Sequence, residues 1–100
     1  MTNSPSPEPG WTIAISEDAA HTLQAMRERG ETQLHDQTVL FCRALAIEAG
    51  AATDAGKPPP GLPMGDHRRN VDVPGLPILI SYTRYPQLRT VRVTDLLWLG

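Results

Sequence analysis

The chain has 100 residues, of which 40% are hydrophobic, and its formal net charge is −2. This length accommodates one domain around a single core and excludes two domains. No segment approaches the roughly 20 consecutive apolar residues of a membrane-spanning helix, and residues 1–9 lack the basic start and apolar centre of a secretory signal, so we expect a cytoplasmic protein without membrane contact.

The charges are distributed unevenly along the chain. Residues 1–56 hold eight acidic and three basic residues, a net charge of −5, whereas residues 57–100 hold six basic and three acidic residues, a net charge of +3. The slightly negative net charge disfavours a protein whose whole surface is basic and binds nucleic acid. The position of the basic residues therefore matters more than the sum.

The N-terminal half predicts a tail, a strand and a helix. We expect residues 1–10 to form a disordered tail, because Ser, Pro and Glu supply little apolar surface, and residues 11–100 to form a single domain. Residues 11–15 alternate with the period of a half-buried strand. Ser16 is a suitable N-cap for a helix that runs to about Arg29, where Gly30 ends it.

A second, better-defined amphipathic helix is predicted from about Thr32 to Ala49 or slightly beyond. Neither helix can bury its apolar side alone, so we expect an antiparallel helix pair packed on a sheet. Residues 51–64 contain Pro58-Pro59-Pro60, whose missing amide donors disfavour both helix and central strand, and they are predicted to be an extended loop.

Three strands are predicted after the loop. One begins near His67 or Arg68 and ends at Val73, and residues 78–84 and 90–99 form a terminal hairpin with its turn at residues 85–89. The predicted fold class is α+β, in the order β-α-α-β-β-β, with a mainly antiparallel sheet. The first strand joins this sheet at an edge or in parallel pairing.

Alternation along the last strand sorts its side chains onto two faces. Val91, Val93, Leu97 and Leu99 fall on one side, and Arg92, Thr94, Leu96 and Trp98 fall on the other, so Arg92 is predicted to point away from the core. Arg84 shares its parity with Ile78, Ile80 and Tyr82, which leaves two alternatives: it faces the core side, or it frays into the turn.

Arginines of the C-terminal half are the candidate binding residues, since a guanidinium can hold a phosphate or a carboxylate by two-point contact. The alternative is that these arginines only keep the outer face and edges of the sheet soluble. Trp98 is either a core residue or an exposed aromatic that anchors a partner. The candidates for contact with nucleic acid or a protein partner are Arg68, Arg69, Arg84, Arg89, Arg92 and Trp98.

Other chemistry has little support in the sequence. His21, His35 and His67 lack ligand spacing with one another or with Cys42, so we expect no metal site, and no motif indicates a cofactor. His67 is the only histidine with basic neighbours. Cys42 lies among apolar residues of the second helix and is predicted to be a small core residue. No catalytic residue is assigned.

The order of the elements, with the segment Gly75-Leu76-Pro77-x-Leu79-Ile80-x-Tyr82, resembles the RelE/ParE toxin superfamily and is closer to its ParE-like branch. The resemblance spans about residues 11–99. It implies a toxin of a type II toxin–antitoxin pair that acts on DNA gyrase or on translated mRNA, with a cognate antitoxin as partner. The alternative is a protein of the same fold without toxicity that acts as a small binding module.

The chain departs from the ribonuclease members of that superfamily at two places. Leu76-Pro77-Ile78 stands where those members carry an arginine, and Trp98 stands at or near the position of their terminal histidine. The resemblance thus implies a missing phosphate contact and a missing general acid or base at the C-terminus. Cleavage of mRNA is the less favoured activity on this ground.

Overall fold

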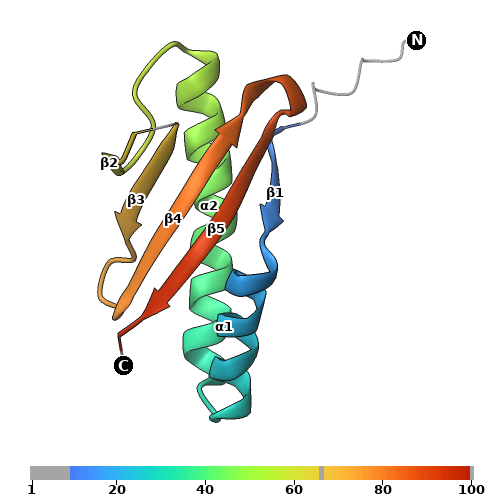
Figure 1. The fold of residues 1–100 in the computed structure, drawn as a ribbon, viewed down its shortest axis with the longest axis vertical. Helices are drawn as coiled ribbons and strands as arrows, with labels where there is room; N and C mark the ends of the chain where they lie inside the picture. The colour runs from blue at the N-terminus through green and yellow to red at the C-terminus, as the bar shows by residue number, and fades with distance from the viewer. Residues whose placement is uncertain (1–9, 66, 100) are drawn as a thin grey trace, which may run out of the picture.

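Two helices cover one face of a five-stranded sheet in the computed structural model, which describes residues 10–65 and 67–99 (Figure 1). All but the last residue of the predicted tail therefore lies outside the described part. The elements, in chain order, are β1 (Thr12–Ile15), α1 (Glu17–Glu28), α2 (Thr32–Asp54), β2 (Leu62–Pro63), β3 (Arg68–Asp72), β4 (Ile78–Tyr85), the 3-10 turn η1 (Pro86–Leu88) and β5 (Thr90–Trp98). Neither helix is long and apolar enough to cross a membrane.

The predicted start of α1 is confirmed. The Ser16 hydroxyl accepts a hydrogen bond from the Ala19 amide at 3.1 Å, and Glu17 and Asp18 occupy the first turn, where the helix dipole favours negative charge. The helix ends at Glu28, and Gly30 follows with φ of +79°. This left-handed conformation costs glycine little, which explains the stop at this position.

The second helix is longer than the sequence indicated. It continues to Asp54, so the prediction that residues 51–54 belong to the loop is wrong. Alanines at positions 51 and 52 favour helix, and the chain leaves the helix only at Gly56, whose φ is +69°. The helix therefore extends along the whole sheet (Figure 1).

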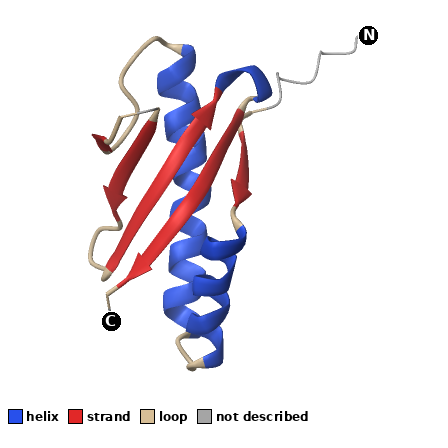
Figure 2. Cartoon of the chain, viewed as in Figure 1, coloured by secondary structure: helices blue, strands red, loops and turns tan. Residues whose placement is uncertain are grey.

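The sheet has the order β1-β5-β4-β3-β2, with β1 parallel to β5 and all other neighbours antiparallel (Figure 2). The first strand was predicted to lie at an edge or to pair in parallel. Both are correct, since β1 is an edge strand and is parallel to β5. The predicted loop is partly wrong, because Leu62–Pro63 forms the short edge strand β2 against β3. Proline is tolerated there because an edge strand has one unpaired side.

A single core cluster lies between the helices and the sheet. Tyr82 and Ile80 of β4 and Val91 and Val93 of β5 are fully buried in it, and Cys42 of α2 is nearly so, as predicted. Further members come from α1, α2 and the segment before β1, namely Ala19, Met26, Leu45, Ala46, Ala49 and Trp11. Because the cluster packs one face of the sheet against the helices, the opposite face is the one that the helices leave uncovered.

A bulge in β5 inverts the predicted faces of its second half. Ser81 pairs with Asp95 and Tyr82 pairs with Val93, so Thr94 is an extra residue without a partner in β4. Beyond it Leu96 is 7% exposed and Leu97 is 52% exposed. The assignment of Leu97 and Leu99 to the core side and of Leu96 and Trp98 to the outer side is therefore wrong, because an inserted residue shifts the period of two.

Candidate binding face of the sheet

The outer face is the sheet side that α1 and α2 leave uncovered (Figure 1). Two of the predicted arginines lie on it in one cross-strand row. Arg68 of β3 pairs with Thr83 of β4, and Thr83 pairs with Arg92 of β5. Directly paired residues share a face, so these three side chains form a line across the sheet, called here the arginine row. The prediction that Arg92 points away from the core is confirmed, because Arg92 is exposed between buried Val91 and Val93.

A shallow hollow of about 290 Å³ lies beside this row. It is lined by Arg68 and Thr83 of the row, by Thr94 at the bulge, and by Met64 and Gly65 between β2 and β3. The extra residue in β5 places the Thr94 side chain beside the row, and its hydroxyl donates to the Ser81 carbonyl at 3.1 Å. The hollow thus offers a ligand the fixed charge of Arg68 and the hydroxyl of Thr83, whereas the Thr94 hydroxyl donates its proton to Ser81 and can only accept.

The two arginines of the row keep their donors available. Neither guanidinium makes a hydrogen bond or an ion pair with another described residue. Strands lie about 4.8 Å apart, so the Cα atoms of Arg68 and Arg92 are separated by roughly 10 Å across Thr83. Two long side chains at this spacing can converge on one phosphate or carboxylate group, with the Thr83 hydroxyl between them.

Arg69 and Arg84 do not belong to this face. Arg69 pairs with Tyr82, whose side chain is in the core, and its Nη1 donates to the carbonyls of Pro59 and Gly61, each at 3.0 Å. Arg84 lies on the helix side of β4, where Nη1 donates to the Thr53 hydroxyl at 3.0 Å. Of the two alternatives for Arg84, the core side is correct, and fraying is wrong because β4 continues to Tyr85.

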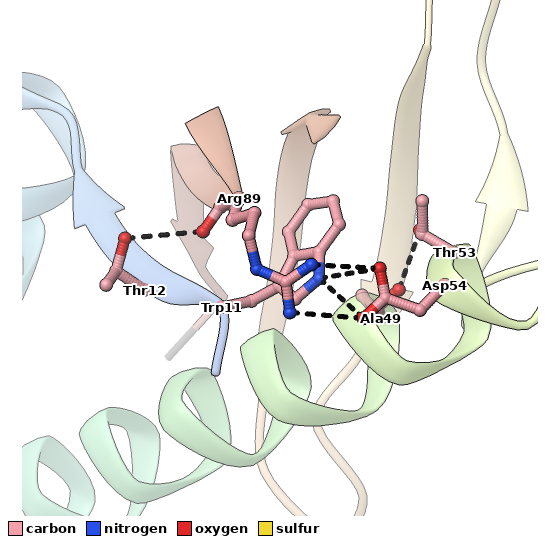
Figure 3. A network of polar contacts seen from close by, with 6 residues as sticks. All are labelled: Trp11, Thr12, Ala49, Thr53, Asp54 and Arg89. Carbon is pink, nitrogen blue, oxygen red and sulfur yellow. Dashed lines mark hydrogen bonds and ion pairs between the residues drawn. The ribbon is translucent and has the colours of Figure 1, made fainter. Parts of the chain in front are cut away.

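Arg89 does not lie on the outer face. It connects three parts of the chain (Figure 3). It follows η1 with φ of +48°, and its guanidinium contacts both carboxylate oxygens of Asp54, at 3.3 and 3.2 Å. The same group lies 5.7 Å from the ring of Trp11. The backbone carbonyl of Arg89 accepts a hydrogen bond from the Thr12 amide at 2.9 Å. These contacts connect the β4–β5 turn to β1 and to the end of α2.

Trp98 is on the helix side of the sheet because of the bulge. It is partly buried against the core, and the Arg29 guanidinium lies 5.0 Å from its ring centroid. Of the two sequence alternatives for Trp98, the core role agrees with this position. His67 lies in the turn before β3 with φ of +66°, and no group of three or more His, Cys, Asp or Glu that could hold a metal is found within residues 10–65 and 67–99.

The sequence did not single out Thr83 and Thr94. Alternation along β4 already places Thr83 opposite to Ile80 and Tyr82, so the signal for Thr83 was present. Thr94 could not be found in this way, because its position depends on the bulge. The structure brings Arg68, Arg92 and these two threonines together and separates Arg69, Arg84, Arg89 and Trp98 from them.

Comparison with known proteins supports the fold. No family model and no curated protein sequence matches the chain. Among solved structures, the chain is similar to one from the crystal structure of the intact E. coli RelBE toxin–antitoxin complex, with a TM-score of 0.51 and 12% sequence identity over 91% of this chain and 99% of that chain. The predicted fold class is therefore confirmed: two helices pack on a five-stranded mixed sheet with a RelE-like α+β fold.

Proposed function

We propose that this chain is the toxin-like component of a type II toxin–antitoxin pair, with the arginine row as its contact surface. The RelE-like fold supports the toxin-like role, since the similar solved structure is a toxin–antitoxin complex. The observation that carries the proposal is the pair of arginines, Arg68 and Arg92, that flank Thr83 on the open face and have no partner among residues 10–65 and 67–99. An exposed pair of this kind suits an acidic protein surface or a phosphate.

The partner is a cognate antitoxin that covers the outer face. Acidic residues of the antitoxin would lie on Arg68 and Arg92, and its apolar residues would lie on the exposed leucines at the other end of the face, Leu97 and Leu99. Cover of this kind hides the contact surface and keeps the protein inactive. Release of the antitoxin then exposes the arginine row to the cellular target.

The target is DNA gyrase, as in the ParE-like branch, or translated mRNA, both reached in the cytoplasm. The arginine row supplies two positive charges and one hydroxyl group, but cleavage of mRNA also requires a group that transfers protons near neutral pH. Arginine and threonine side chains do not titrate there. The chemistry of the row therefore favours binding to gyrase over cleavage of mRNA.

Growth after tightly controlled induction in bacteria tests the proposal. We compare the wild type with Arg68→Ala and Arg92→Ala, and use Arg27→Ala, an exposed arginine on α1, as the matched control. Growth arrest by the wild type and the control, with relief in both row variants at equal expression, is the expected result. DNA breaks then indicate gyrase, and loss of mRNA indicates cleavage.

A second candidate is a binding module of the same fold without toxicity. It is favoured by the structural use of Arg69, Arg84 and Arg89, which leaves only two of the five predicted arginines for a target. In this case induction leaves growth normal, while the chain still co-purifies with the product of the adjacent reading frame. Normal growth together with a free chain contradicts both candidates.

A further inference from the structure

The outer edge of β1 carries backbone groups that no described strand pairs. The Thr12 and Ser16 amides both donate to carbonyls on the β5 side, each at 2.9 Å. Backbone groups along a strand alternate in direction, so the N–H and C=O groups of Ile13 and Ile15 point to the other side. Within the described part of the chain no strand lies there, because β1 ends the strand order of the sheet. Two donors and two acceptors are therefore open to an added strand.

The two edges of the sheet differ in how well they can accept a further strand. The edge strand β2 has only two residues, and one of them is Pro63, which has no amide hydrogen. The four residues of β1 include neither a proline nor a charged residue. Short length, proline and charge are the usual protections of an edge. The edge of β1 is therefore the better site for strand addition (Figure 1).

Two recesses lie between this edge and α2. The first has a volume of about 440 Å³ and is lined by Trp11, Thr12, Ile13, Arg43, Ala46 and Ile47. The second has a volume of about 160 Å³ and is lined by Ile13, Ile15, Leu23, Val39, Cys42 and Arg43. Ile13 and Arg43 line both recesses and so form the boundary between them. The two recesses and this boundary are called here the edge groove.

A strand added to β1 directs every second side chain into the edge groove. Ile13 and Ile15 share a face with buried Val91 and Val93, which is the helix side, and the residues paired with them share that face too. The residue opposite Ile15 enters the second recess. An apolar cavity of roughly 150 Å³ takes up benzene, so this recess has room for one branched aliphatic side chain.

The other two groove-facing positions meet different surroundings. The residue opposite Ile13 lies at the boundary beside Arg43, which is exposed and makes no hydrogen bond or ion pair with another described residue. An acidic side chain at that position can pair with the guanidinium. The next groove-facing residue, beside Trp11, enters the largely apolar first recess. The complementary segment thus has aliphatic, acidic and aliphatic residues at alternate positions, a pattern that is the same in both strand directions.

The chain itself does not contain a segment of this kind that could occupy the groove. The groove-facing residues of β1 are Trp11, Ile13 and Ile15, so a second copy would set an isoleucine against Arg43. Residues 1–9 include no Val, Leu or Ile, and Glu8 stands between two prolines without amide donors. Both the charge and the spacing therefore indicate a different protein.

We propose that the open edge of β1 binds an extended segment of another protein by strand addition. An acidic residue of the segment pairs with Arg43, and an aliphatic residue fills each recess. The inference goes beyond the proposed function, which concerns the outer face and the arginine row. It does not depend on that function, because the edge groove is formed by the edge of β1 and by α2.

Fluorescence anisotropy with a labelled, C-terminally amidated peptide tests the proposal on the purified full chain. The probe is Thr-Val-Thr-Glu-Thr-Val-Thr, and the control, Thr-Val-Glu-Thr-Thr-Val-Thr, has the same composition with the acid at an outward-facing position. The probe is expected to bind with a dissociation constant roughly tenfold lower than that of the control, because only its acid reaches Arg43. Failure of both peptides to bind, or equal binding of the two, overturns the proposal.

Charge exchange tests the role of Arg43. Arg43→Glu is expected to weaken binding of the probe about tenfold and to prefer a probe with lysine in place of glutamate. Arg27→Glu is the matched control, since Arg27 is exposed on α1 and lines neither recess. Circular dichroism verifies that each variant is folded. Dimerisation of the chain that Arg43→Glu strengthens identifies a second copy as the occupant and overturns the proposal.

N-methylation of the probe tests the backbone pairing. In an antiparallel strand the amide of the acidic residue donates to β1, whereas in a parallel strand the amides of the flanking threonines do. A methyl group on one of these two kinds of amide, and not on the other, is expected to weaken binding about tenfold. Equal effects at both positions overturn strand addition. None of these outcomes depends on the growth assay.

Discussion

The indole Nε1 of Trp11 donates to both carboxylate oxygens of Asp54, at 3.3 and 3.2 Å, and so joins the residue before β1 to the last residue of α2 (Figure 3). Asp54 also forms an ion pair with the Arg89 guanidinium. One carboxylate therefore connects three segments that are far apart in sequence. All three meet at the end of the sheet where β4 turns into β5.

Replacing Asp54 by alanine should lower the free energy of unfolding by about 1 kcal/mol. The loss is modest because the Asp54 side chain is about half exposed, and water screens its pairing with Arg89. Urea denaturation measures the change. Asp72→Ala, an exposed carboxylate at the end of β3, serves as the control and should stay within about 0.5 kcal/mol of the wild type.

Gly50→Ala should destabilise the protein, although alanine is the better helix former. An exchange of this kind inside a helix normally stabilises by about 1 kcal/mol. Here a Cβ at position 50 would lie 2.3 Å from Cγ of Trp11, a contact that requires the indole to move. We expect a net loss of about 1–3 kcal/mol by urea denaturation. The same exchange made in a Trp11→Gly background, which removes the ring and also the Trp11 Cβ that would lie 2.7 Å away, should no longer destabilise.

Arg68 and Arg69 are neighbours in sequence and should respond differently to alanine. Arg69→Ala removes hydrogen bonds to Pro59 and Gly61, so the unfolding free energy should fall by about 1–2 kcal/mol. Arg68→Ala should leave stability within about 0.5 kcal/mol and instead relieve growth arrest. Equal losses of stability in both variants would contradict the assignment of the two side chains to opposite faces.

Tyr82→Phe should destabilise by about 1–2 kcal/mol without changing the fold. The Tyr82 hydroxyl donates to the Pro60 carbonyl, and phenylalanine leaves that carbonyl without this donor. Burial raises the pKa of Tyr82, so the hydroxyl remains a donor at neutral pH. Thermal unfolding measures the effect. Tyr85→Phe, at an exposed position next to the turn, is the control and should melt with the wild type.

The Cys42 thiol should react with a thiol reagent at pH 8 only as fast as the protein unfolds. Cys42 is 2% exposed, and burial raises its pKa from 9.0 to about 11. The folded state binds the thiol proton more tightly than the unfolded state does. The stability contributed by the protonated Cys42 thiol is therefore complete below pH 9 and is lost as the pH rises towards 11. Cys42→Ala should lack that part of the pH dependence. Fast labelling in the folded state would contradict the buried position.

Local patterns were sufficient for most elements. Trp11 to Ile15 alternate, Ser16 caps α1 through its own hydroxyl, and Gly30 ends the turn after α1, and each of these depends on residues close together in the chain. The end of α2 was the exception. Proline and glycine after position 55 suggested an earlier stop, whereas helix propensity and contact with Trp11 continue the helix to Asp54.

The sequence by itself determined the α+β class, the order of the elements apart from the short strand β2, and the outward direction of Arg92, because these follow from the periods of helix and strand over a few residues. Only the tertiary structure decided which arginines share a face. The bulge at Thr94 moves Leu96 and Trp98 to the core side, and the carbonyls of residues 59 and 61 hold Arg69. Strand register and loop contacts join residues far apart in the chain, so local periodicity does not contain them.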